Sequence, residues 1–95
     1  MGELRFVGLD VHKKTVVGCI MQTQPEGSVS TKIRTFATTT AGLLALADWL
    51  TAQQVTHVAM ESTGIYWRPV FNVLEGAFTV ILESLLGRIH IRRPR

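Results

Sequence analysis

Short apolar runs broken by polar turns occupy the first third of the chain, and their pattern predicts strands. Residues 4–10 (LRFVGLD) form an apolar run that ends in a carboxylate, which is typical of a strand buried on both faces. A polar break at residues 12–14 separates it from a second apolar run at 15–21, and so short a connection favours an antiparallel hairpin. Residues 31–36 (TKIRTF) alternate polar and apolar, as in a half-exposed strand. We therefore expect the chain to begin with a three-stranded meander.

Helical spacing follows, and it alternates with two further strands. One apolar stripe has the spacing of a helix face: Leu43, Leu46, Ala47 and Leu50. A threonine at 38–40 can cap this helix, and residues 55–60 then read as a strand that ends at a carboxylate. A second helix is expected through residues 66–74, with Ser62 or Thr63 as its cap. Residues 77–82 (AFTVIL) predict a last buried strand.

The predicted order is β-β-β-α-β-α-β, an antiparallel meander followed by two crossover units. Crossovers through helices imply parallel pairing, and such connections are right-handed in nearly all proteins. Ninety-five residues make one small domain. The order predicts an α/β fold with a mixed, ribonuclease H-like sheet, although actin-like ATPases share much of this order of elements.

Composition narrows the class of protein only modestly. Hydrophobic residues make up 46% of the chain and charged residues 18%, which indicates a globular domain. The net charge is +3, and four of the ten basic residues fall within the last eight positions, so the body of the chain is nearly neutral. A single cysteine, Cys19, excludes an internal disulfide and a multi-cysteine metal site. No apolar run approaches the length of a membrane span, and we expect a cytoplasmic, nucleoid-associated protein.

Two carboxylates are candidates for chemistry because each ends a predicted strand. If the strands of Asp10 and Glu61 are parallel neighbours, both side chains emerge at the sheet edge where open α/β sheets bind ligands. Carboxylates in such positions can share one Mg²⁺. The alternative is structural, since Asp10 can cap a turn and Glu61 can precede a helix whose dipole favours it. His12 could likewise lean toward the metal or be an ordinary turn residue.

Two segments together resemble the start of IS110-family insertion-sequence transposases. They are GLDVHKKTVVGCI (residues 8–20) and THVAMESTGIYWRPVFNVLEG (residues 56–76), and the resemblance covers about residues 4–82. It implies a RuvC-like fold with a DEDD set of acidic residues that uses Mg²⁺ or Mn²⁺ to cut and rejoin DNA. Asp10 would be the first acid of that set and Glu61 the second. DNA is the implied partner, with a guide RNA possible in intact relatives.

The chain departs from the family pattern after Leu82. The resemblance implies a basic, glycine-containing segment and a D-x-x-D helix with the last two acids, but the sequence here reads ESLLGRIHIRRPR, in which Glu83 is the only acid. We therefore predict a partial transposase domain at residues 1–82, incomplete at its C-terminus, and a divergent, out-of-frame basic tail at 83–95. Metal binding is expected in intact relatives rather than in this truncated chain, which should be inactive alone.

A few exposed residues are candidates for contacts with nucleic acid. Lys13 and Lys14 lie in the turn beside the first acid and could touch a phosphate backbone or remain solvated charges. Arg68 could bind phosphate from the second helix. Tyr66 and Trp67 are aromatic and could stack on bases, although helical spacing favours core packing for Trp67.

Two other classes of function compete with this interpretation. A sugar-kinase or actin-like ATPase would need a glycine two positions after Asp10 to approach phosphate, and His12 stands there instead. A non-catalytic module could bind nucleic acid, form a homo-oligomer or join the assembly of a full-length transposase through exposed apolar surface.

Overall fold

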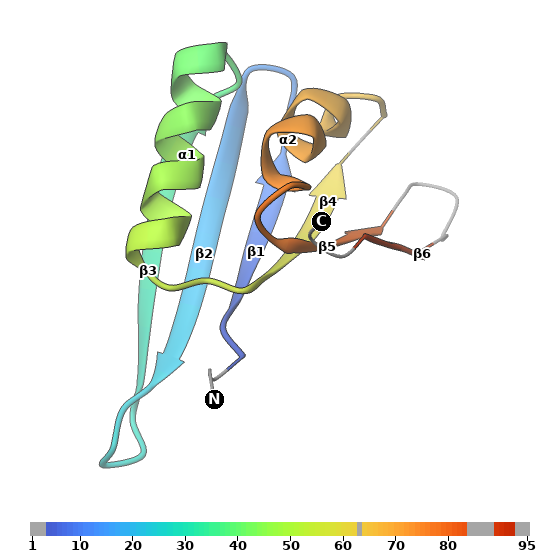
Figure 1. The fold of residues 1–95 in the computed structure, drawn as a ribbon. Helices are drawn as coiled ribbons and strands as arrows, with labels where there is room; N and C mark the ends of the chain where they lie inside the picture. The colour runs from blue at the N-terminus through green and yellow to red at the C-terminus, as the bar shows by residue number, and fades with distance from the viewer. Residues whose placement is uncertain (1–3, 63, 84–88, 93–95) are drawn as a thin grey trace.

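A computed structural model describes residues 4–62, 64–83 and 89–92, the last of these as backbone only. Six strands and two helices follow one another along the chain (Figure 1). Their bounds are β1 Phe6–Val11, β2 Thr15–Thr23, β3 Val29–Ala37, α1 Thr40–Ala52, β4 His57–Ser62, α2 Trp67–Leu74, β5 Thr79–Glu83 and β6 Ile89–Arg92. The predicted order of elements is therefore confirmed through β5.

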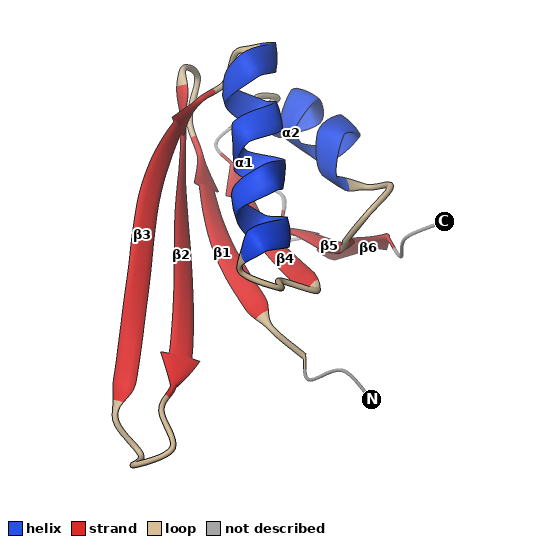
Figure 2. Ribbon diagram, turned by 60° about the vertical axis from the view of Figure 1, so that its left-hand side comes forward, coloured by secondary structure: helices blue, strands red, loops and turns tan. Residues whose placement is uncertain are grey.

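The strands form one mixed sheet in the order β3-β2-β1-β4-β5-β6. The first three strands pair antiparallel as a meander, and β1, β4 and β5 pair parallel through the two helical crossovers. Both helices lie on one face of this sheet (Figures 1 and 2). This arrangement confirms the predicted mixed, ribonuclease H-like sheet.

The core lies between the two helices and the sheet face that they cover. Buried residues of α1 and α2 pack there against alternate residues of the strands, such as Val7, Leu9 and Val11 of β1. The hydroxyl of Thr39 accepts a hydrogen bond from the Gly42 amide at 3.1 Å and so caps α1, as one of the predicted threonines should. The helix then covers the sheet through four buried residues: Leu43, Leu46, Trp49 and Leu50.

The opposite face of the sheet, called here the open face, carries the side chains that alternate with the buried ones along each strand. In β1, Phe6, Gly8 and Asp10 are exposed there, so the prediction of a strand buried on both faces is wrong. The open face is nevertheless partly apolar. Gly8 lies in register between Cys19 of β2 and Ala59 of β4. Cys19 therefore lies half-buried on this face and not in the core, although its place within an apolar run predicts a small core residue.

Most strand bounds differ from those predicted by one or two residues, and three further points concern the C-terminal half of the described chain. β5 begins at Thr79 because the Phe78 amide donates to the Leu74 carbonyl at 3.1 Å and prolongs the turn after α2. Ser62 ends β4 and does not cap α2, while Thr63 lies outside the described residues. β6 was not predicted at all, yet it pairs antiparallel with β5. The remaining tail positions, 84–88 and 93–95, also lie outside the described residues.

Neither described helix has both the length and the apolar character that crossing a membrane would require.

Candidate active site

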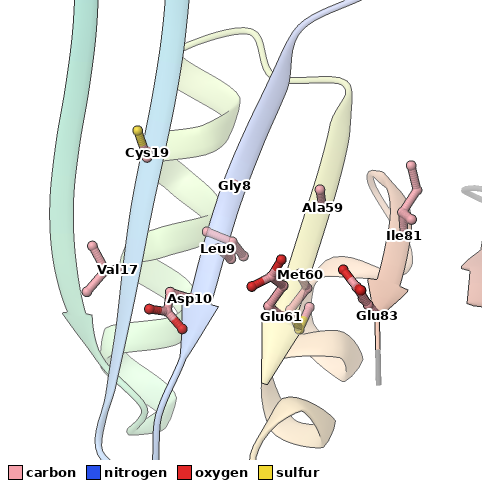
Figure 3. A pocket seen from close by; sticks show the side chains of 10 residues that line it. All are labelled: Gly8, Leu9, Asp10, Val17, Cys19, Ala59, Met60, Glu61, Ile81 and Glu83. Atoms are coloured by element: carbon pink, nitrogen blue, oxygen red, sulfur yellow. The ribbon is translucent and has the colours of Figure 1, made fainter. Parts of the chain in front are cut away.

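Three carboxylates lie side by side across the parallel part of the sheet. Asp10 of β1 pairs in register with Glu61 of β4, and Glu61 pairs in register with Glu83 of β5. All three are exposed on the open face, close to the carboxyl ends of their strands (Figure 3). The expected juxtaposition of residues 10 and 61 is therefore present, because β1 and β4 are parallel neighbours.

The acid row, meaning Asp10, Glu61 and Glu83, borders a shallow depression of about 410 Å³ on the open face. Its floor consists of small or apolar residues, namely Gly8, Cys19, Ala59 and Ile81. The face is hollowed over the central strands because Gly8 and Ala59 offer little or no side chain there. A charged group approaching this face would thus meet carboxylates at one end of a mostly apolar surface.

The carboxylates of the acid row do not converge on one point. In Figure 3 the carboxylate of Glu61 extends toward β1, whereas that of Asp10 turns to the side of β2. Neighbouring strands lie ~4.8 Å apart, so a row across three strands is spread over roughly 10 Å. Within residues 4–62, 64–83 and 89–92, no group of three or more His, Cys, Asp or Glu side chains could hold a metal ion.

His12 occupies the other side of Asp10. Its Nε2 lies 3.2 Å from Oδ2 of Asp10, and both side chains are more than half exposed, at 51% for His12 and 64% for Asp10. The contact is an ion pair only when the imidazole is protonated, and otherwise a hydrogen bond. His12 is thus a partner of the candidate acid as well as a turn residue.

The two lysines of the β1–β2 turn lie at the same end of the sheet as the acid row. Lys13 and Lys14 are exposed, and their backbone is fixed by the segment before α1. The Thr38 hydroxyl donates to the Lys13 carbonyl at 3.0 Å, and the Thr38 amide donates to the Lys14 carbonyl at 3.1 Å. The turn therefore presents its two cations from a fixed backbone.

The aromatic and basic residues of α2 lie on the helix side of the sheet. Trp67 packs against the core and meets Phe71 edge-on at 5.7 Å between ring centroids, which confirms the packing role expected for Trp67. Arg68 is exposed, with its guanidinium 5.4 Å from the centre of the Trp67 ring. Because the acid row points to the open face, Arg68 is separated from it by the edge of the sheet.

Sequence reasoning missed Glu83 as a member of the acid row. The signal was present, since Glu83 directly follows the apolar run of β5 just as Asp10 and Glu61 stand near the ends of their own strands.

Comparison with known proteins gives a family and a fold. A family model for DEDD transposases of the IS110 type matches residues 7–88. The fowlpox virus Holliday junction resolvase superposes with a TM-score of 0.62 at 15% identity, covering 85% of this chain and 61% of the resolvase. RuvC of Thermus thermophilus gives 0.58 at 11% identity, covering 85% and 64%. Its complex with a Holliday junction substrate gives 0.61 at 9%, covering 88% and 66%.

At these identities the likeness to the resolvases concerns the fold alone, and it confirms a RuvC-like architecture. The chain spans between three fifths and two thirds of the length of those proteins. No curated protein matches it.

Proposed function

Because the chain belongs to the DEDD transposases of the IS110 family, we propose that it is the N-terminal part of a metal-dependent DNA recombinase whose first two acids are Asp10 and Glu61. The observation that carries the proposal is the register of these two residues on parallel neighbouring strands at the carboxyl edge of the sheet. Ligands of open α/β sheets bind at that edge.

The chemistry of the two carboxylates suits a single Mg²⁺ or Mn²⁺ ion, and to share it the Asp10 carboxylate would have to turn from β2 toward Glu61 (Figure 3). Carboxylate oxygens are the ligands that these ions prefer, and Mg²⁺ commonly binds one or two carboxylates while it keeps several waters. A bound ion would supply Lewis-acid polarisation of a phosphoryl oxygen. The protein's own part is to hold the two carboxylates on fixed strands, and His12 positions Asp10 through its 3.2 Å contact.

Two neighbouring carboxylates are too few for a two-metal centre. Nucleases of that type hold their ions about 4 Å apart with roughly three or four carboxylates, whereas the acid row here is spread across three strands. We infer that this chain alone does not cut DNA. The division into a domain at residues 1–82 and a basic tail at 83–95 also remains a prediction.

DNA is the proposed partner. Lys13 and Lys14 lie beside the acid row and can contact phosphates, and Arg68 can do so from the other side of the sheet edge. One RuvC structure and one fowlpox resolvase structure of the same fold contain a Holliday junction, which supports a nucleic-acid substrate for this architecture. A guide RNA remains a prediction from the family resemblance.

Mn²⁺ binding tests the metal centre directly, and it can be measured by calorimetric titration of the purified chain. The sequence alone predicts metal in intact relatives only, but the register of Asp10 and Glu61 leads us to propose one weak site in this chain. We therefore expect weak binding in the unmodified protein and no measurable binding in Asp10→Asn or Glu61→Gln. Asp48→Asn is the matched control, because Asp48 is an exposed acid on α1, away from the open face. Equal Mn²⁺ affinity in the unmodified chain and in Asp10→Asn would rule out the proposed centre.

Nicking of a supercoiled plasmid in Mg²⁺ or Mn²⁺ tests the expected inactivity separately. We expect no nicking above background. Reproducible nicking that disappears in Asp10→Ala would support the metal centre and show that this chain is sufficient for cleavage.

A second candidate function rests on the open face. Phe6, Met21 and Ile33 are large apolar residues exposed there, which suits association with a second copy or with a full-length transposase. Co-purification of the chain with an intact relative would support such a role. The role would be excluded if the chain sediments as a monomer and does not co-purify with the intact relative.

A further inference from the structure

Two apolar side chains are exposed in the turn that joins β4 to α2. Ile65 is 72% exposed and Tyr66 is 38% exposed, three and four positions after the end of the strand that carries Glu61. The turn lies at the same end of the sheet as the Lys13–Lys14 turn (Figure 1). Single exposed apolar residues are ordinary, but here two adjacent ones are exposed at the end of the sheet where the acid row lies (Figure 1).

The turn has a fixed backbone. Gly64 adopts a φ of +84°, which side-chain-bearing residues rarely tolerate, and the Arg68 amide donates to the Ile65 carbonyl at 3.3 Å. Tyr66 is already in the helical region at the N-cap of α2. Ile65 and Tyr66 are therefore held in place by the chain on either side of them.

Packing of α2 does not need these two side chains. The helix is anchored by Val70 and Leu74, which are fully buried, and by Trp67, which packs against the core. The apolar surface of Ile65 and Tyr66 is thus left for another molecule.

Charge and size indicate which molecule that is. Among the described residues of the turn and the first turn of α2 there is no acid, and Arg68 contributes a cation. Lys13 and Lys14 add two more cations along the same edge. Two side chains are far too small a surface for a stable protein interface, which buries about 800 Å² per partner. One nucleobase, by contrast, can be held by a single aromatic ring or an apolar wedge.

We infer that Ile65 and Tyr66 form a nucleobase-contact site, in which the Tyr66 ring stacks on an unpaired DNA base and Ile65 packs beside it. Phosphates of the same strand would meet Lys13, Lys14 or Arg68. The inference rests on the proposed function, since it assigns these residues to the DNA that the acid row would act on.

Binding of two oligonucleotides of equal length, measured by fluorescence anisotropy at one fixed salt concentration, tests the inference. One is labelled oligothymidylate, and the other is its abasic counterpart, which has the same phosphates and no bases. Tyr66→Ala should weaken binding of oligothymidylate by roughly 5- to 150-fold, the range for loss of one stacked base. It should leave binding of the abasic strand unchanged, and Tyr66→Phe should bind as the unmodified chain does.

Leu44→Ala is the matched control, because Leu44 is an apolar residue that is 54% exposed on α1. Thermal melting of each variant checks that the fold is kept. Unchanged oligothymidylate binding in both Tyr66→Ala and Ile65→Ala would overturn the base contact and leave the metal centre standing. Equal losses on both oligonucleotides would also overturn it, since the turn would then contact phosphate.

An unmodified chain that binds neither oligonucleotide would overturn the base contact together with the DNA part of the proposed function, whereas Mn²⁺ titration judges Asp10 and Glu61 independently. Loss of self-association in Tyr66→Ala, without any DNA binding, would assign the pair to a protein contact and reject the inference.

Discussion

Gly18 of β2 lies directly beneath the Trp49 ring of α1, and Gly18→Ala should destabilise the protein. A Cβ at this position would lie 2.8 Å from Cζ3 of Trp49 and 3.3 Å from Cδ2 of Leu9. Ordinary contact begins near 3.4 Å, so the Trp49 ring would have to move by about 0.6 Å. The ring has little freedom to do so, because it is buried and lies 5.5 Å from the Phe36 ring.

Overpacking of this kind costs about 1–3 kcal/mol of the free energy of unfolding. For a domain of this size that corresponds to a fall in melting temperature of roughly 4–24 °C. Urea denaturation followed by tryptophan fluorescence measures it, and we expect a lower midpoint with an unchanged slope, since the surface exposed on unfolding stays the same.

Gly8→Ala is the matched control on the neighbouring strand. A Cβ there would face the open side of the sheet, with its nearest neighbour, the Cys19 carbonyl oxygen, at 4.0 Å. We expect equal or slightly higher stability, because glycine within a strand costs about 0.5–1 kcal/mol relative to alanine. If Gly18→Ala were as stable as Gly8→Ala, the close packing of Trp49 on β2 would be refuted.

Three further predictions concern the same fold. Leu46→Ala should lower the free energy of unfolding, measured by urea denaturation, by about 2–5 kcal/mol because the Leu46 side chain is fully buried. Leu44 is exposed, so Leu44→Ala should change the free energy of unfolding by less than about 0.5 kcal/mol. Equal effects of the two substitutions would contradict the assigned faces of α1. Thr39→Ala removes the cap of α1 and should lower the free energy of unfolding by about 1 kcal/mol, and no change would mean that the cap is dispensable. The Ser28 hydroxyl, through its hydrogen bond, lowers the pKa of Glu26, so Ser28→Ala should raise that pKa in an NMR titration. Because the folded-state pKa of Glu26 is lowered, any stabilisation from this contact is present at neutral pH and is lost as the pH falls through that pKa. An unchanged Glu26 pKa in Ser28→Ala would exclude the hydrogen bond as the cause of the lowered pKa.

The meeting of Asp10 and Glu61 could be predicted because it follows from the order of elements. A helix between two strands forces them to run parallel, so two acids near the ends of such strands reach the same edge. The same rule predicted that β5 runs parallel to β4. Only the register, which decides whether side chains share a face, had to come from the structure.

Other features depended on information that local patterns do not contain. Apolar content alone predicted burial of β1 on both faces, but burial depends on what packs there, and both helices cover the same side. β6 was missed because four residues are a short strand with little periodicity, and its formation depends on pairing with β5. The contact of His12 with Asp10 depends on side-chain direction in a turn, which spacing does not determine.

The pairing of β1 with β4 joins residues that are 51 positions apart in the sequence, as Asp10 and Glu61 are. Closing so long a loop costs entropy before the contacts between the strands repay it, so such pairing tends to form late in folding. The β2–β3 hairpin is local and can form within microseconds. A nascent chain would therefore contain the hairpin well before it contains the acid pair, and the pair cannot exist until β4 has left the ribosome and docked.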